Sequence, residues 1–169
     1  AAEFVLAVEE VGRATEGLVA TVGQITAHPG ASNVVPGRTH LTLDVRHADD
    51  AVRTAAAEAI LSRARSIALT RGVSVSFDRR NDTQAAACDA TLTARLETAI
   101  ATSGYPVHRL VSGAGHDAVA LSARLPVAML FVRCAGGVSH NPAESITVED
   151  VAVALEVLDT FIAGFVRSR

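Results

Sequence analysis

The sequence predicts an α/β protein built in two parts, and three observations support this. Apolar residues recur with helical and then strand-like periodicity along the 169 residues. A polar, Ala-rich segment at 81–89 has the composition of a linker. The run VAMLFV at 127–132 is typical of a strand buried on both faces of a parallel sheet. We therefore expect an α+β unit followed by an α/β unit.

The first part opens with a helix. Phe4, Val5, Val8 and Val11 share one face of the segment 1–14. The pattern is already helical at Ala1, with neither a Met nor a capping residue before it, so we expect a truncated chain. A strand rich in β-branched residues is predicted at 18–28, a sharp turn at 29–38, and a strictly alternating strand at 39–47.

A long helix and a further strand complete this part. Asp49 or Asp50 can cap a helix that runs to about Thr70, with Gly72 at its C-terminal end. The segment 73–79 alternates again and is predicted as a strand. The order α-β-β-α-β becomes the ferredoxin-like arrangement if one strand is added before Ala1. The missing strand is a second indication of truncation.

The second part is predicted to follow the linker at 81–89. It begins with a helix at 90–103 closed by Gly104, followed by a short strand near 105–111 and a helix at 118–124. The apolar strand 127–132 leads into a loop at 134–145. Thr147 caps a final helix. Its predicted packing stripe comprises Val151, Leu155, Leu158, Ile162 and Phe165.

Composition excludes several classes of partner. A net charge of -3 and a pI near 6.1 provide no field for nucleic acid or an anionic membrane. Two cysteines are too few for a disulfide framework. The sequence has no signal peptide and no apolar run long enough to span a bilayer. A cytoplasmic protein is the resulting expectation.

His140 is a candidate metal ligand, because it lies in the loop after a predicted buried strand, where α/β proteins place their sites. Glu144 could orient the imidazole. The alternative is a loop histidine without a ligand role, and one ligand alone never makes a zinc site.

The turn SGAGHDA at 112–118 is a second candidate. Gly113 and Gly115 permit close backbone approach, and His116 could donate a hydrogen bond to a bound carbonyl or anion. The alternative is a tight turn in which Asp117 simply caps the next helix.

Asn33 and Arg46 form the third candidate. Arg46 ends a strand on its polar face and can bind a carboxylate through two parallel hydrogen bonds. Asn33 lies in the turn that leads to the same strand. The alternative is a surface Arg46 paired with Asp44 or Asp49.

Three motifs, taken in order, indicate a family. TVGQITAHPGASNVVPGRTHLTLDVRH (21–47), SGAGHDA (112–118) and MLFVRCAGGVSHNPAES (129–145) resemble the amidase/hydantoinase/carbamoylase family of the zinc aminopeptidase-carboxypeptidase superfamily. The resemblance covers essentially the whole chain. It implies that 1–82 is most of a lid domain that forms a homodimer, and that 83–169 is the carboxy-terminal part of an α/β catalytic domain.

The resemblance also implies roles for particular residues. His140 matches a metal ligand, while Asn33, Arg46, Gly115 and His116 match residues that bind the substrate. The other ligands of two divalent ions (zinc or manganese) and the general-base Glu belong to the family's amino-terminal part, and so does the start of the catalytic sheet. The isolated chain is therefore expected to contain no catalytic base and to be inactive alone.

The implied reaction is metal-dependent hydrolysis of an amide C–N bond in a ureido or N-carbamoyl acid. The loop around His140 favours allantoate amidohydrolase activity, with N-carbamoyl-L-amino-acid hydrolase activity as the alternative. A different class stays open as well: a non-catalytic, dimerising module that binds a small acid through Asn33 and Arg46.

Overall fold

A computed structural model describes residues 1–166 of the chain, so the last three residues of the predicted second part lie outside the described residues. The structure divides into two compact units, 1–85 and 86–169. The division falls inside the segment 81–89 that the composition predicts as a linker.

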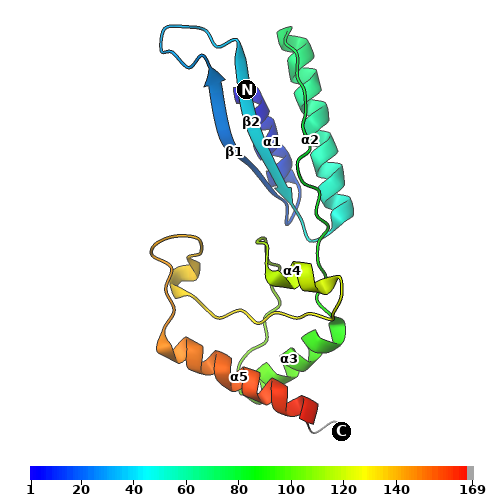
Figure 1. The fold of residues 1–169 in the computed structure, drawn as a ribbon, viewed down its shortest axis with the longest axis vertical. Coiled ribbons are helices and arrows are strands. Elements are labelled where there is room, and N and C mark those ends of the chain that lie inside the picture. Colours follow the sequence, from blue (N-terminus) through cyan, green and yellow to red (C-terminus); the bar gives the residue numbers. More distant parts are fainter. Residues whose placement is uncertain (167–169) are drawn as a thin grey trace. The chain divides into compact units, whose positions relative to one another are not determined.

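The first unit contains two helices and an antiparallel hairpin (Figure 1). Its elements are α1 (Ala2–Ala14), β1 (Val19–His28), β2 (Arg38–Arg46) and α2 (Asp50–Arg71). β1 and β2 pair in register from Val19 with Arg46 to His28 with Arg38, with an irregularity between Val22 and Ile25. Each of the four predicted elements is present, with ends within two residues of those expected.

The core of this unit lies where α1 packs on α2. Val8 of α1 and Ile60 of α2 are fully buried. Together with Ile60, α2 buries the small residues Ala56, Ala64 and Ala68 on one face, which let the two helices approach closely. Glu10 accepts two hydrogen bonds from Arg63, and Glu3 pairs with Arg71, so α1 and α2 run antiparallel.

Local signals fix both ends of α2. The Asp49 carboxylate accepts from the backbone N–H groups of Ala51 and Val52, at 2.7 and 3.4 Å. Gly72 at the other end adopts the left-handed conformation (φ 63°), which glycine reaches without a steric penalty. These are the capping roles predicted from the sequence.

The predicted strand at 73–79 does not form. No strand is assigned to it within residues 1–166, and Val73, Val75 and Phe77 are between 41% and 61% exposed. A strand exists only where a neighbour supplies backbone hydrogen bonds, and the sole ladder in the described residues is β1–β2. The Arg65 guanidinium covers the Phe77 ring at 5.2 Å.

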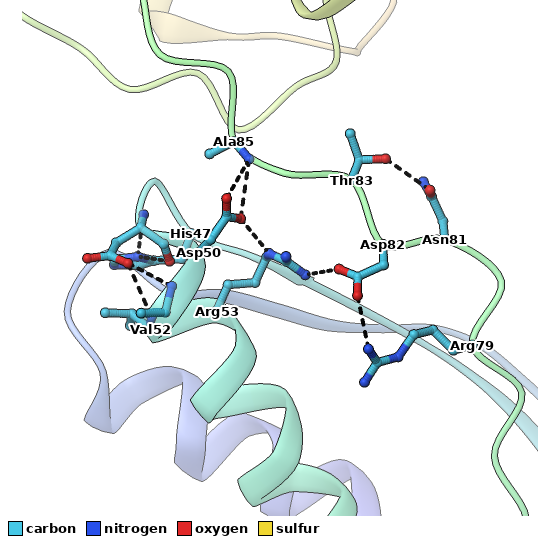
Figure 2. A network of polar contacts seen from close by, with 11 residues as sticks. His47, Asp50, Val52, Arg53, Arg79, Asn81, Asp82, Thr83 and Ala85 are labelled. Carbon is cyan, nitrogen blue, oxygen red and sulfur yellow. Dashed lines mark hydrogen bonds and ion pairs between the residues drawn. The ribbon is translucent and has the colours of Figure 1, made fainter.

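A network of ion pairs then holds the end of this segment against α2 (Figure 2). Arg53 donates to Asp50 at 3.1 Å and to Asp82 at 2.8 Å, and Asp82 also accepts from Arg79 at 2.9 Å. The Asp50 carboxylate accepts the backbone N–H of Ala85 through both oxygens at 3.2 Å. The chain is thus fixed to the first turn of α2 up to the point where the first unit ends.

The second unit is built on two packed helices, α3 (Ala90–Thr102) and α5 (Val148–Val166), with a short α4 (Asp117–Ser122) and a 3-10 turn, η1 (Ala135–Gly137). Leu96, Ala99 and Val157 form its buried contact. Thr147 caps α5 as predicted: its hydroxyl accepts from the backbone N–H of Asp150 and donates to the Asp150 carboxylate.

Three predictions for this unit are wrong. The segments 105–111 and 127–132 are not strands among the described residues, and Phe131 and Val132 are 46% and 40% exposed, so no parallel sheet surrounds them. On α5, Val157 is the buried residue, whereas the predicted stripe members Leu155 and Ile162 are 58% and 59% exposed. α5 is apolar on more than one face, and the sequence pattern does not show which face will pack. In the structure, α3 covers the face that carries Val157. Within residues 1–166, no helix has the length and apolar character needed to cross a membrane.

Candidate functional site

Arg46 ends β2 as the sequence predicts, and its side chain is half exposed. Its guanidinium makes a two-point contact with Asp44, from Nε to Oδ1 at 2.6 Å and from Nη2 to Oδ2 at 3.0 Å. This contact raises the pKa of Arg46 above its ordinary value, chiefly through the hydrogen bond and secondarily through the charge of Asp44. Arg46 therefore carries a fixed positive charge in the planar geometry that suits a carboxylate.

His47, which follows Arg46, fastens this end of the strand. Its Nδ1 accepts the backbone N–H of Asp49 at 2.9 Å, and its Nε2 lies 3.1 Å from the carbonyl oxygen of Glu16. Both contacts are satisfied at once when Nε2 carries the proton. The ring thus links the turn after α1 to the start of α2 and limits where Arg46 can move.

Asn33 is exposed in the turn between the two strands. The base of this turn is closed by a hydrogen bond from the Gly37 N–H to the His28 carbonyl at 3.0 Å. β2 begins beside the turn at Arg38 and ends at Arg46, so Asn33 and Arg46 lie at opposite ends of the hairpin (Figure 1). Eight residue steps along a strand span about 27 Å. Within one chain, the two side chains cannot contact the same small carboxylate.

His140 adopts a left-handed backbone conformation (φ 56°), which is unusual for a residue other than glycine. Its backbone N–H donates to the Glu144 carboxylate at 2.9 Å. The loop is further closed by a hydrogen bond from the Ala135 N–H to the Ser145 carbonyl at 2.8 Å. Glu144 therefore contacts the backbone of His140, whereas the sequence suggested that it orients the imidazole. The His140 side chain is left exposed.

The residues present do not by themselves fit a metal centre. In the part of the chain that the structure describes, no group of three or more His, Cys, Asp and Glu side chains could hold a metal ion. Zinc sites use three or four protein ligands, and His140 supplies one donor at most. A complete site built on His140 would need donors other than those that the described residues bring together.

The turn at 112–118 is organised around His116. His116 is the N-cap residue of α4, and Asp117 is the first helical residue, so the alternative in which Asp117 caps this helix is wrong. Ser112 Oγ lies 2.6 Å from His116 Nε2 and also accepts the backbone N–H of Ala114 at 3.2 Å. The Phe131 ring meets the imidazole edge-on at 6.1 Å. Gly115 has no atom within 4 Å of where a Cβ would lie.

Ser112 is the residue that sequence reasoning missed. Its position four residues before His116 was visible, but serine in a Gly-rich turn is common and the spacing alone indicates no contact. Only the folded turn shows that its hydroxyl lies against the imidazole.

Comparison with known proteins identifies the family. The model of Peptidase family M20/M25/M40 matches residues 2–164, and the chain belongs to this family. The family comprises metal-dependent hydrolases. Within it, solved structures named as hydantoinase/carbamoylase amidases share the fold, which confirms the resemblance stated above. One from Burkholderia multivorans has a TM-score of 0.88 and 34% identity over 95% of this chain and 39% of that one.

Relatives of known name point to two activities. The chain is 41% identical over 158 residues to an N-carbamoyl-L-amino acid amidohydrolase of Geobacillus stearothermophilus, covering 94% of this chain and 39% of that protein. It is 42% identical over 173 residues to a probable allantoate deiminase of Oryza sativa subsp. japonica, covering 91% and 34%. A structure described as AtUAH in complex with glyoxylate has a TM-score of 0.85 and 32% identity over 96% of this chain and 39% of that one. The chain thus spans between about a third and two fifths of the length of these proteins.

Proposed function

We propose that the full-length protein containing this chain is a metal-dependent hydrolase that cleaves the amide C–N bond of a ureido or N-carbamoyl acid. The observation that carries the proposal is the similarity of nearly the whole chain to proteins named for these activities. Allantoate is the proposed substrate. N-carbamoyl-L-amino acids are the second candidate, which the Geobacillus stearothermophilus relative favours.

Arg46 is the residue that we propose to bind the substrate carboxylate. Its partner Asp44 already occupies the guanidinium in the two-point geometry that a substrate carboxylate would adopt. Both side chains are about half exposed. Exposed ion pairs contribute only about 0–1 kcal/mol, so a substrate carboxylate can replace Asp44 at little cost.

Asn33 would act on the same substrate from a second copy of the chain. Because β2, which is about 27 Å long, lies between Arg46 and the turn that holds Asn33, one chain cannot bring both to one ligand. A homodimer formed through the first unit could place the turn of one protomer near the strand end of its partner. We therefore propose a homodimer with substrate sites shared between protomers.

His140 would contribute one ligand to a centre of two divalent ions, zinc or manganese. The donor set within residues 1–166 does not complete such a centre. The proposal therefore requires the remaining ligands and the general base from another part of the full-length protein. The 169-residue chain alone should bind no metal pair and hydrolyse nothing.

The test is a substrate panel run on two proteins. The full-length protein and the isolated 169-residue chain are assayed for ammonia release from allantoate and from N-carbamoyl-L-amino acids, with manganese or zinc added. We expect the full-length protein to release ammonia and the isolated 169-residue chain to release none. Turnover by the isolated chain would contradict the assignment of the remaining ligands to another part of the protein.

The same purified full-length protein distinguishes a hydrolase from a non-catalytic binding module. A non-catalytic module would bind these acids in a calorimeter without releasing ammonia and would contain no stoichiometric metal. That combination in the full-length protein would replace the hydrolase proposal.

A further inference from the structure

We propose that Ser112 is a positioning residue that holds His116 in the Nδ1–H tautomer and so turns an N–H donor toward the acidic substrate. The inference rests on the proposed function, because it assigns His116 a hydrogen bond to a ureido or carbamoyl acid. The hydrogen bond between Ser112 and His116 does not depend on that function, because it is seen in the geometry of the turn.

The two side chains lie within hydrogen-bonding distance, and either one could donate. Ser112 Oγ and His116 Nε2 lie 2.6 Å apart. Bonds in which an N–H donates to oxygen have lengths of about 2.7–3.2 Å, whereas hydroxyl donors reach about 2.5 Å. We take the hydroxyl as the donor to an unprotonated Nε2, because Ser112 Oγ already accepts the backbone N–H of Ala114.

The surroundings of the hydroxyl agree with this assignment. Ser112 Oγ accepts the backbone N–H of Ala114 at 3.2 Å, so the chain of donors runs from Ala114 to Ser112 to His116. A hydroxyl that accepts one hydrogen bond and donates another is satisfied in both roles. Ser112 is half-buried, so part of this series of hydrogen bonds is shielded from water.

The imidazole is also restrained at its edge and at its backbone. Phe131 packs against it with an interplanar angle of 72°, and His116 is the N-cap residue of α4. Among residues 1–166, no hydrogen-bonding partner lies at Nδ1. The ring is thus held at one nitrogen while the other is free for a ligand.

The free nitrogen determines which ligands suit the site. If Ser112 donates to Nε2, the neutral ring has its proton on Nδ1 and can donate from there. Carboxylate and ureido carbonyl oxygens are acceptors, so they match this donor. Without Ser112 the ring can take the other tautomer, in which Nδ1 carries a lone pair that repels the same oxygens.

The experiment reads the tautomer and the kinetics of the full-length protein separately. Ser112→Ala removes the hydroxyl, Ser112→Thr retains it, and Ser122→Ala is the matched control, because Ser122 bonds only to the Val119 carbonyl of α4. Long-range ¹H–¹⁵N spectra with histidine-selective labelling report the protonated nitrogen, and a His116→Gln variant assigns the signal. We expect Nδ1–H in the wild type, Ser112→Thr and Ser122→Ala, and a shift toward Nε2–H in Ser112→Ala.

Kinetics then test the consequence for the substrate. Ser112→Ala should raise KM for the acid substrate about tenfold with little change in kcat, the loss expected for one hydrogen bond to a charged ligand, and Thr should restore it. A wild-type Nε2–H tautomer, or unchanged spectra and KM in Ser112→Ala, would overturn the inference. If the full-length protein hydrolyses none of the panel, the proposed function fails, while the spectra still decide whether Ser112 fixes the ring.

Discussion

Asn33 and Arg46 lie at opposite ends of one hairpin, separated by the full length of β2. The family resemblance implies that both bind the substrate, yet β2, about 27 Å long, separates Arg46 from the turn that holds Asn33. If both roles are correct, each substrate site takes Arg46 from one protomer and Asn33 from its partner.

Mixing two variants that are each weakened in substrate binding tests this arrangement in the full-length protein, at a substrate concentration below the wild-type KM. Asn33→Ala and Arg46→Ala are each purified, mixed, and allowed to exchange subunits. Half of the random dimers are mixed, and each mixed dimer rebuilds one intact site of two, so about a quarter of the wild-type activity should return. The rate of ammonia release before and after subunit exchange measures the recovered activity. No recovery, with subunit exchange verified by mass spectrometry, would place both residues in one protomer or remove one from its role.

Asp44→Asn tests whether the intramolecular pair competes with the substrate. The variant removes the carboxylate that occupies Arg46, so KM for an acidic substrate should fall, by no more than about fivefold because exposed pairs contribute up to about 1 kcal/mol. Asp78→Asn is the matched control, since Asp78 and Arg80 form an ion pair at the same spacing on an exposed segment. A rise in KM would mean that Asp44 orients the guanidinium instead of competing for it.

His140→Ala tests the proposed metal ligand by a readout other than activity. Elemental analysis of the full-length protein should show fewer divalent ions per protomer in the variant than in the wild type, since removing a ligand weakens binding at that position. His108→Ala, another exposed histidine of the same unit, should retain the wild-type content. Equal metal content in both variants would remove His140 from the centre.

Asp82 should make stability depend on pH through its pair with Arg53. The hydrogen bond from Arg53, then its charge, holds the pKa of Asp82 below the ordinary value of 3.8. A depressed pKa means that the pair stabilises the fold above about pH 4 and that this contribution is lost as pH falls through the lower folded value.

Urea unfolding at about pH 6 and about pH 3 checks this, because the contribution of the pair is complete at the higher pH and begins to be lost below the ordinary pKa of Asp82. At the higher pH, Asp82→Asn should unfold at a lower midpoint urea concentration than the wild type. At the lower pH, the difference between the two midpoints should be smaller. Asp78→Asn serves again as the control, and its difference in midpoint from the wild type should not become smaller at the lower pH. A gap between Asp82→Asn and the wild type that is equal at both pH values would contradict the assignment.

Local chemistry explains which elements could be predicted. Asp49, Gly72 and Thr147 fix helix ends through contacts with their own neighbours in sequence, and all three act as expected. The strands predicted at 73–79 and 127–132 need a neighbouring strand, and the β1–β2 hairpin is the only ladder among the described residues. Their alternating or apolar patterns record a tendency to pair, which does not become a strand without a neighbour.

The candidate site shows the same limit. The sequence names Arg46, Asn33, His116 and His140 by motif, but their mutual geometry comes from the fold. The separation of Asn33 from Arg46 follows from the register of the hairpin. The contact of Ser112 with His116 follows from the shape of a turn rich in glycine. The use of Glu144 for the His140 backbone follows from a left-handed residue that no pattern indicates.

The central claim is that Arg46 binds the carboxylate of a hydrolysed ureido or carbamoyl acid. The most direct measurement compares kcat/KM for the acid and for its neutral carboxamide analogue, in the full-length wild type and in Arg46→Ala. We expect the wild type to favour the acid by at least about tenfold, the size of one charge-assisted contact, and Arg46→Ala to lose that preference. An Arg46→Ala enzyme that still prefers the acid by the wild-type factor would contradict the account.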